Sequence, residues 1–591
     1  MREELAPPTA SRASRRFSPA PGWAGRPTSA ALLRVPTDAA LAAALAAVTL
    51  IVRLVFAAAR PTDWDSVQFV EGLRHYDVTH GSPHPPGYFL YEVAGRTVMA
   101  ITGFDGTASL VVVAAVASAA AAGVLYLTAR QFLGRWLSVG AVALVATSPV
   151  AWYAGSMVNT YSFDALASAL MLLLARRATP GGRWGAAACA TLAVLSGFRQ
   201  SLAETMSVLA LVAVVATVRR PRHLAACVAA GVAGLAVWMV PLALVQPGGL
   251  SAWYRATRLE SSGAFHASSL LAANHGAGRV NFGTLAAYTV ILLGPAVVVA
   301  VIGGVARMVP GDHRKDPSTK PAVIRPWYQT APALLVAALA PAVIIYTLVE
   351  FGKGGYALAF VPATTITLLA SVASPGRWAG GAGPAAAVSA AVAAVVIVAA
   401  VAINTDRFTA GAGVVPAFVP AHLGGLWLGQ ARYGAPYPET HRTIETADRA
   451  DRQLQALAAH IRPGDQLIYA ADQPGLVPFR NVGWALPDVE ESFVTGSSVL
   501  YQQLHGLLYY SAGATLPVRP GTPVFLLVSN PAGPDAAALS TAGDAADTGW
   551  RAAGWQVWRV RPGTAIGGVT VTMTAAPPPL AGSIGRPAPA A

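Results

Sequence analysis

Charged residues are scarce in this chain: Asp, Glu, Lys and Arg make up only 12% of its 591 residues, while 54% are hydrophobic. An average soluble domain carries about 25% charged residues. This composition excludes an ordinary soluble protein and a protein with a single membrane anchor, and it predicts many spans in lipid. Cysteine is nearly absent, and both Cys189 and Cys227 lie inside apolar runs. We interpret them as packing residues, and we expect no disulfide framework outside the membrane.

Three further features are missing, and each absence excludes a class of protein or segment. The net charge is +13, but no basic stripe is interleaved with aromatic residues, so we expect no nucleic-acid partner. The chain has no Walker pattern and no glycine-rich loop on the predicted inner side, which argues against a nucleotide site. No apolar signal-peptide segment directly follows the N-terminal charges. We interpret residues 1–36 as a disordered cytoplasmic tail.

Apolar runs long enough to cross a bilayer are frequent, and they predict a polytopic α-helical membrane protein. We count about eleven such runs, near residues 38–59, 107–128, 137–155, 160–175, 184–198, 201–218, 222–246, 283–306, 329–349, 353–373 and 379–403. Every second loop is basic, as the positive-inside rule requires if the N-terminus is cytoplasmic. These loops hold Arg130 and Arg135; Arg176, Arg177 and Arg183; Arg219, Arg220 and Arg222; Arg307, Arg314, Lys315 and Lys320; and Arg377.

An odd number of spans places the C-terminal region outside the cytoplasm. Residues 404–574 are more polar, and they contain a helical pattern over Ile444–Ile461. Short strands are predicted at Gln466–Ala471, Pro523–Ser529 and Trp555–Val560. We therefore expect an extracytoplasmic α/β or α+β domain after a transmembrane catalytic domain at residues 37–403. A Pro- and Ala-rich disordered tail is predicted at residues 575–591.

The most informative segment, residues 60–106, follows the first span. It contains Asp63-Trp64-Asp65-Ser66 and then His84-Pro85-Pro86-Gly87-Tyr88. We expect a short helix around Ser66–Tyr76 and an amphipathic helix from about Gly87 to Ala100 on the membrane interface. Three of its aromatic residues would lie at the level of the lipid headgroups: Tyr88, Phe89 and Tyr91. Carboxylates, histidines and a Pro-Pro-Gly turn beside the bilayer indicate a reaction centre there.

The motifs of this segment resemble those of the polytopic GT-C glycosyltransferases, and most closely the set related to protein O-mannosyltransferases and bacterial aminoarabinose transferases. The first motif is Trp64-Asp65-Ser66-Val67-x-Phe69, followed by Pro83-His84-Pro85-Pro86-Gly87-Tyr88. Further matches are Ser148-Pro149-x-x-Trp152, Asn159-x-Tyr161, Gly197-Phe198-Arg199-Gln200-Ser201 and Gly352-Lys353-Gly354-Gly355-Tyr356. Together they span residues 60–365, and the C-terminal region lies outside the resemblance.

The resemblance implies transfer of a sugar from a polyprenyl-phosphate donor to an acceptor on the outer face, with inversion at the anomeric carbon. It also implies that an acidic residue of the first outer loop is the general base. Asp65 matches the family's acidic position, and Asp63 is the alternative. The competing interpretation is that either carboxylate only caps the following helix, since an anion is stabilised at a helix N-terminus.

Other polar residues of the motifs are candidate substrate contacts. His84, beside the Pro-Pro-Gly turn, is the first choice among the loop histidines, and Asp77 and His80 are further candidates. With His75 these residues could instead hold a metal ion, but their spacing matches no zinc pattern. Asn159 and Tyr161 stand where the resemblance implies a second carboxylate. Asp164, one turn further on, either replaces that acid or is a structural polar group.

Two cations are candidates for the donor phosphate. Arg199 lies at the outer end of a predicted span and matches the Gly-x-Arg-x-Ser pattern; its alternative role is snorkelling to lipid headgroups. Lys353 lies in a glycine-flanked outer turn, where backbone amides can approach a phosphate closely. Its alternative interpretation is a simple tight turn, and Glu350 is a possible ion-pair partner.

The sequence therefore predicts an inverting, polyprenyl-phosphate-sugar-dependent glycosyltransferase. Its composition, rich in Ala, Val and Leu, is typical of a GC-rich bacterial genome, so we expect a bacterial cytoplasmic membrane. The alternatives are a transporter or flippase of a lipid-linked or polar substrate and a non-catalytic scaffold for envelope assembly. No cofactor is required by this hypothesis, and a divalent metal stays open. The sugar is unspecified, and so is the acceptor, which is a protein, a lipid or a glycan.

Overall fold

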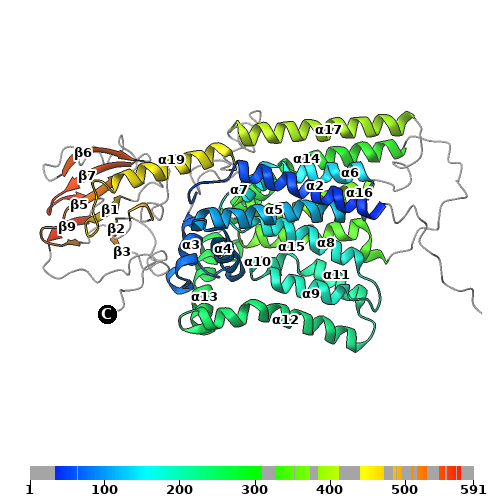
Figure 1. The fold of residues 1–591 in the computed structure, drawn as a ribbon, viewed down its shortest axis with the longest axis horizontal. Helices are drawn as coiled ribbons and strands as arrows, with labels where there is room; N and C mark the ends of the chain where they lie inside the picture. Colours follow the sequence, from blue (N-terminus) through cyan, green and yellow to red (C-terminus); the bar gives the residue numbers. More distant parts are fainter. Residues whose placement is uncertain are drawn as a thin grey trace, which may run out of the picture.

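The computed structural model describes most of the helical region and the strands of the C-terminal region. The described residues are 34–62, 64–272, 275–308, 326–351, 353–372, 384–410, 439–470, 484–486, 489–494, 508–510, 515–528, 545–552, 555–566 and 569–573. The predicted tails at 1–36 and 575–591 lie outside them, apart from residues 34–36, which begin the first helix. Figure 1 shows a bundle of roughly parallel helices with a smaller sheet region at one end.

The bundle consists of apolar helices of two lengths. In the described part of the chain, six helices are long and apolar enough to cross a membrane. They are α2 (Arg34–Val55), α5 (Gly106–Ala129), α12 (Pro221–Val245), α14 (His275–Met308), α15 (Ala331–Leu348) and α17 (Pro384–Thr409). The shorter ones are α6 (Arg135–Ala146), α7 (Pro149–Ser156), α8 (Tyr161–Arg177), α9 (Trp184–Leu195), α10 (Ser201–Thr205), α11 (Ser207–Thr217) and α16 (Val361–Val372).

The helix lengths bear directly on the predicted number of spans. Helices α6 and α7 form a seventh span if they are taken together, with a bend of 65° between them. Each of the predicted apolar runs holds a helix, but α8, α9, α11 and α16 have only 17, 12, 11 and 12 residues. A straight span needs about 20 residues. The count of about eleven spans therefore stays a prediction.

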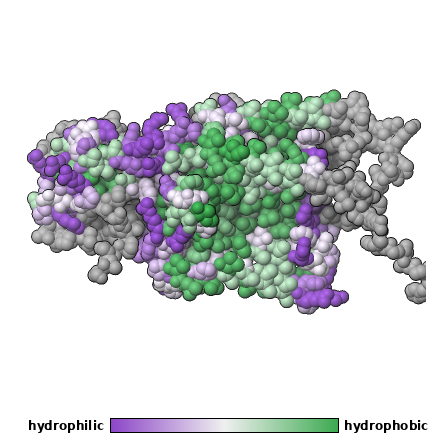
Figure 2. Space-filling model, viewed as in Figure 1, coloured by the Kyte–Doolittle hydropathy of each residue, from purple (hydrophilic) through white to green (hydrophobic). Residues whose placement is uncertain are grey.

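Helix α5 occupies the middle of the bundle and is the most buried of the candidate spans. It packs against α2, α4, α7 and α8. A helix that is apolar on all sides is stable only when neighbours or lipid surround it. Figure 2 shows the corresponding surface, with hydrophobic residues over the bundle and hydrophilic residues where the bundle meets the sheet region.

The segment between α2 and α5 folds into α3 (Trp64–Arg74), η1 (Val78–His80) and α4 (Phe89–Thr102), close to the two predicted helices. The three aromatic residues expected at the level of the headgroups differ in burial, and Tyr88 is half-buried. Their depth in the membrane stays a prediction. Phe89 is 6% exposed and Tyr91 is fully buried, and Tyr91 packs against Phe69 and Phe163 while its hydroxyl donates to the Leu110 carbonyl. Helix α4 is therefore packed into the protein along α5, because its aromatic face finds partners in the bundle.

Residues 247–282, which lie between two of the predicted apolar runs, are largely helical where the structure describes them. They form α13 (Gly249–Ser268) and η2 (Leu270–Ala272), and α14 already begins at His275. Two short helices, η3 (Trp327–Gln329) and η4 (Gly354–Ala359), precede α15 and α16. Both Gly354 and Gly355 lie in tight places, because a Cβ on either one would overlap aromatic rings, those of Tyr288 and Tyr161 respectively. The glycines of this motif are thus required by close packing.

The C-terminal region pairs one helix with a mixed sheet. Helix α19 (His441–Leu457) begins with the Thr440 side chain accepting a hydrogen bond from the Thr443 amide. The strands are β1 (Gln466–Ala470), β2 (Glu490–Val494), β3 (Leu508–Tyr510), β4 (Thr515–Val518), β5 (Val524–Val528), β6 (Ala545–Ala552), β7 (Trp555–Val560), β8 (Ala565–Ile566) and β9 (Val569–Met573). The main sheet has the order β3-β2-β1-β5-β7-β6, and β4-β9-β8 form a second sheet. The helix and the three strands predicted from sequence are confirmed.

Residues alternate between the two faces of the main sheet, as the period of two requires. Leu467, Phe525 and Leu527 pack with Leu454 and Leu457 of α19. Their neighbours Ile468 and Leu526 face the other side, with Leu516 and Val571 of the second sheet. One face of the sheet therefore rests on α19, the helix that Figure 1 places between the sheet and the bundle.

Candidate active site

The candidate site is built around an ion pair between two segments that are far apart in sequence. Asp65 lies in the first turn of α3, and Lys353 directly precedes η4. The Lys353 Nζ lies 2.5 Å from the Asp65 Oδ2, and the two side chains are 34% and 30% exposed. Both side chains are thus partly accessible from outside while they are held in contact. The predicted base and one predicted phosphate ligand are brought together.

The surroundings of Asp65 act on its pKa in two directions. Burial raises the pKa, but the positive charge of Lys353, with smaller contributions from His84 and Arg199, holds it well below its usual range. Asp65 is therefore an anion at all physiological pH values. As long as Lys353 stays beside it, the carboxylate is a weak proton acceptor. The pKa of such a carboxylate rises, and it becomes a stronger base, when another anion binds the neighbouring cation.

A second, more buried ion pair lies on α8 and the turn before α10. The Arg199 Nε is 3.1 Å from the Asp164 Oδ2, and Arg199 Nη1 donates to the Thr160 hydroxyl at 3.1 Å. The guanidinium stacks between two tyrosine rings, at 4.5 Å from the Tyr161 centroid and 4.9 Å from that of Tyr356. Arg199 is only 6% exposed, so its alternative role as a snorkelling side chain is wrong.

The turn Lys353–Tyr356 connects the two pairs. Its first residue contacts Asp65 and its last one stacks on Arg199, while the Tyr356 amide donates to the Lys353 carbonyl at 3.0 Å. The Tyr161 ring fits directly against Gly355, where no side chain is present. The Gly-Gly-Tyr sequence therefore holds two cations at one place on the protein.

The His-Pro-Pro-Gly turn forms another wall. The His84 ring lies 5.3 Å from that of Phe69 and 5.0 Å from that of Tyr88, between centroids. The Pro86 carbonyl accepts a hydrogen bond from Trp253 Nε1 at 2.7 Å, which fixes the turn against α13. Burial raises the pKa of Tyr88 to about 12, so its hydroxyl stays protonated near Asp65 and Lys353. Tyr88 and Tyr356 are site residues to which the sequence analysis assigned no role in the site, although each ends one of the motifs.

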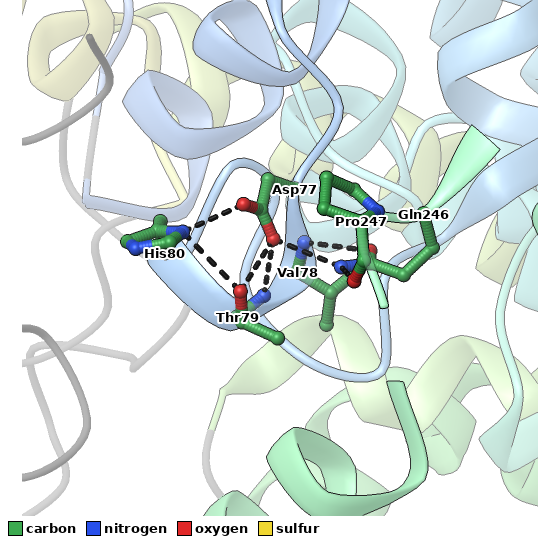
Figure 3. A network of polar contacts seen from close by, with 6 residues as sticks. All are labelled: Asp77, Val78, Thr79, His80, Gln246 and Pro247. Carbon is green, nitrogen blue, oxygen red and sulfur yellow. Dashed lines mark hydrogen bonds and ion pairs between the residues drawn. The ribbon is translucent and has the colours of Figure 1, made fainter. Parts of the chain in front are cut away.

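Asp77 and His80, predicted substrate contacts, belong to a separate network (Figure 3). Asp77 is buried and accepts hydrogen bonds from the Thr79 amide at 2.9 Å, the Thr79 hydroxyl at 2.6 Å and Gln246 Nε2 at 2.9 Å. The His80 Nδ1 lies 2.6 Å from the second carboxylate oxygen, and its side chain is 74% exposed. Burial raises the pKa of Asp77, but these hydrogen bonds outweigh it and lower the pKa. The network ties η1 to the end of α12, and a substrate contact here stays a prediction.

Asn159 is also engaged by the protein itself. Its Nδ2 donates to the Ala154 and Met157 carbonyls, at 3.0 and 3.3 Å, and its Oδ1 accepts from the Tyr161 amide at 2.8 Å. These bonds shape the turn between α7 and α8. The turn in this way positions Tyr161 and the other residues that contact Arg199.

The predicted base alternative Asp63 lies outside the described residues, and so does Gly352 of the glycine motif. Among the described residues, no three His, Cys, Asp or Glu side chains are grouped as metal ligands would be.

The fold and the site define a polytopic membrane protein with paired carboxylates and cations at one end of its helices. The family model of dolichyl-phosphate-mannose-protein mannosyltransferases matches residues 84–245. This match confirms the resemblance found in the motifs, over about a quarter of the chain. No curated protein matches the sequence.

Three solved structures are similar to the chain at low sequence identity. ArnT from Cupriavidus metallidurans, crystallised with bound undecaprenyl phosphate, is similar with a TM-score of 0.46 and 15% identity, over 89% of this chain and 98% of that one. Its apo form gives a TM-score of 0.45 and 14% identity, over 90% and 98%. The arabinofuranosyltransferase AftD from Mycobacteria gives 0.42 and 15%, over 88% of this chain and 40% of AftD.

Proposed function

We propose that this protein is an inverting glycosyltransferase that moves a sugar from a polyprenyl-phosphate donor to an acceptor hydroxyl at the extracytoplasmic face of the membrane. The observation that carries the proposal is the Asp65–Lys353 pair beside the stacked Arg199, at the end of a membrane-spanning bundle. The family match and the motif order support the same chemistry. A lipid phosphate would reach these cations from the bilayer.

The two cations differ in how readily they can change partner. Arg199 and Asp164 are both buried, and separating a buried pair leaves an uncompensated charge that costs about 3–5 kcal/mol. Lys353 and Asp65 are about one third exposed, and such a pair contributes only about 0–1 kcal/mol. We therefore assign the exchange of partners to Lys353. Arg199 then acts as a fixed part of the phosphate site.

The proposed reaction is a single displacement. When the donor phosphate takes Lys353, Asp65 loses its counter-ion and its pKa rises, so it becomes a stronger base. The acceptor oxygen forms the new bond to the anomeric carbon, its proton goes to Asp65, and the bond between that carbon and the phosphate oxygen breaks. The electron pair of that bond leaves with the polyprenyl phosphate.

Charge develops on the phosphate during this step. The donor is a phosphodiester with one negative charge, whereas a phosphate monoester carries about −1.5 to −2 at neutral pH. Groups that contact the phosphate therefore bind the transition state more strongly than the ground state, which is the condition for catalysis. Lys353 supplies charge, and the protonated hydroxyl of Tyr88 is a candidate donor beside it. His84 is a candidate contact for the sugar or the acceptor.

The test is transfer by the purified full-length protein with a panel of polyprenyl-phosphate sugars, followed by determination of the anomeric configuration of the product. We expect a product of inverted configuration. A product of retained configuration would contradict the single displacement. Movement of a lipid-linked substrate across proteoliposome membranes without sugar transfer would instead support the transporter hypothesis.

A further inference from the structure

The segment that begins α19 reaches the site from the C-terminal region. Glu439 is 4% exposed, and its two carboxylate oxygens lie 2.8 and 3.0 Å from the Tyr288 hydroxyl of α14. A Cβ on Gly354 would overlap both this carboxylate and the Tyr288 ring. Gly354 directly follows Lys353. The buried carboxylate therefore packs against the backbone that carries the cation of the Asp65–Lys353 pair.

Helix α19, which begins two residues after Glu439, holds the other side of that pair. The Asp448 carboxylate accepts hydrogen bonds from the Ala59 amide at 3.2 Å and the Arg60 amide at 3.0 Å. The Arg60 side chain lies 3.7 Å from Asp451, one turn further along α19. Ala59 and Arg60 belong to the short connection from α2 to α3, which carries Asp65 in its first turn. The backbone that leads to the predicted base is thus fixed to α19 by two hydrogen bonds.

The opposite side of α19 belongs to the C-terminal sheet. Leu454 and Leu457 pack against Leu467, Phe525 and Leu527 of the strands. Figure 1 shows α19 lying between the bundle and this sheet. A buried carboxylate is costly to keep, and a neutral residue could fill the same space at lower cost. Asp448 is only half-buried, whereas Glu439 is buried, so the acidic group at Glu439 indicates a function beyond packing.

We propose that Glu439 and Asp448 are positioning residues, through which the C-terminal sheet region sets the geometry of the Asp65–Lys353 pair. Glu439 positions Lys353 through Tyr288 and Gly354, and Asp448 positions Asp65 through the Ala59 and Arg60 amides. Neither carboxylate is proposed to touch the substrate. The inference rests on the proposed function for its kinetic part, whereas its structural part is measurable without any activity.

The kinetic test compares Glu439→Ala, Glu439→Gln and the matched control Glu445→Ala, an exposed residue on α19, the helix that begins two residues after Glu439. A misplacement of reacting groups by about 1 Å can cost about 100-fold in rate. We expect Glu439→Ala to lower kcat by about 10- to 100-fold with little change in the KM for the acceptor. Glu439→Gln keeps the size and an acceptor oxygen for Tyr288 and should restore most of the rate. Glu445→Ala should behave like the wild type.

A double-mutant cycle asks whether Glu439 acts through Lys353. In the Lys353→Met background, Glu439→Ala should have almost no additional effect on kcat, because the cation that it positions is gone. Independent, multiplicative losses would overturn the proposal. So would wild-type kcat in Glu439→Ala.

Amide hydrogen exchange supplies the readout that does not depend on activity. In Glu439→Ala, we expect faster exchange in Gly354–Ala359 and unchanged exchange in α5, whereas Glu439→Gln keeps the protection. Unchanged exchange at Gly354–Ala359 would overturn the positioning role whatever the activity shows. If the wild type transfers no sugar from any donor while exchange responds as expected, the proposed function fails and the structural coupling stands.

Discussion

Replacing Lys353 by methionine separates the structural from the chemical role of the Asp65–Lys353 pair. Methionine keeps the length of the side chain and removes its charge. Because both side chains are about one third exposed, the pair contributes about 0–1 kcal/mol to the free energy of unfolding. We therefore expect the melting temperature of the variant to stay close to that of the wild type.

The effect on catalysis should be much larger. A charged group aimed at a developing phosphate charge is worth roughly 10²–10³ in kcat, and we expect a loss of this order. The pKa of Asp65 should also rise, because burial raises it and Lys353 is the main group that lowers it. In the free wild-type enzyme Asp65 stays ionised down to strongly acidic pH. In the variant the acidic limb of the pH profile of kcat/KM, which reports the free enzyme, should move to higher pH.

The assay is the pH dependence of sugar transfer, measured from pH 4 to 9 alongside thermal unfolding in the same detergent. A tenfold smaller rate that results from unfolding would be visible in the melting curve. A Lys353→Met variant with wild-type kcat and an unshifted acidic limb would refute the proposed exchange of partners. In that case Lys353 would neither contact the donor phosphate nor control the pKa of the catalytic base.

Three further predictions concern other parts of the site. Arg199→Met leaves Asp164 buried without its ion-pair partner and should destabilise the protein by about 3–5 kcal/mol. Adding Asp164→Asn should recover most of the lost melting temperature. Without such a recovery, the unpaired carboxylate would not be the cause of the destabilisation. Gly355→Ala places a Cβ on the Tyr161 ring and should abolish transfer, whereas Gly134→Ala, which meets nothing within 4 Å, should not; equal activity of the two would contradict the packing argument. Burial raises the pKa of Glu439 from its ordinary value of 4.5 to about 7, so the folded protein keeps a proton that the unfolded chain has lost. The contribution of Glu439 to the free energy of unfolding is fully present below pH 4.5. This contribution decreases by about 3 kcal/mol as pH rises through about 7. Glu439→Gln should therefore melt higher than the wild type at pH 8 but not at pH 4.5, and parallel melting profiles would contradict this shift.

Much of the architecture could be predicted because it depends on periodicity. The apolar runs predicted the helices of the bundle, and the short apolar segments at Gln466–Ala470, Val524–Val528 and Trp555–Val560 predicted strands. The number of complete spans could not be predicted in this way. A continuous apolar run does not reveal where its helix bends, as the chain does between α6 and α7. The packing of α4 against α5 could not be predicted, because an aromatic face suits a membrane interface and a protein interior equally well.

At the site, sequence reasoning identified single residues but not their pairing. Asp65 and Lys353 were assigned to separate roles, and only the fold shows that their side chains meet across the length of the catalytic region. Glu350 was considered as the partner of Lys353 because it is near in sequence. Glu439 carries no motif, and no local pattern could have indicated that it packs against Gly354. Contacts between distant segments depend on topology, which local patterns do not contain.

The central claim is that Asp65 takes the proton of the acceptor hydroxyl in sugar transfer from a polyprenyl phosphate. The measurement that tests it most directly is the single-turnover rate of transfer of a radiolabelled sugar by wild-type, Asp65→Asn and Asp105→Asn protein. Asp105 is the matched control, an exposed carboxylate that caps α5 by accepting from the Ala108 amide, a bond that asparagine can also make. We expect Asp65→Asn to lose about 10²–10⁴-fold in rate at unchanged melting temperature, and Asp105→Asn to retain the wild-type rate. Equal rates for all three proteins would contradict the account.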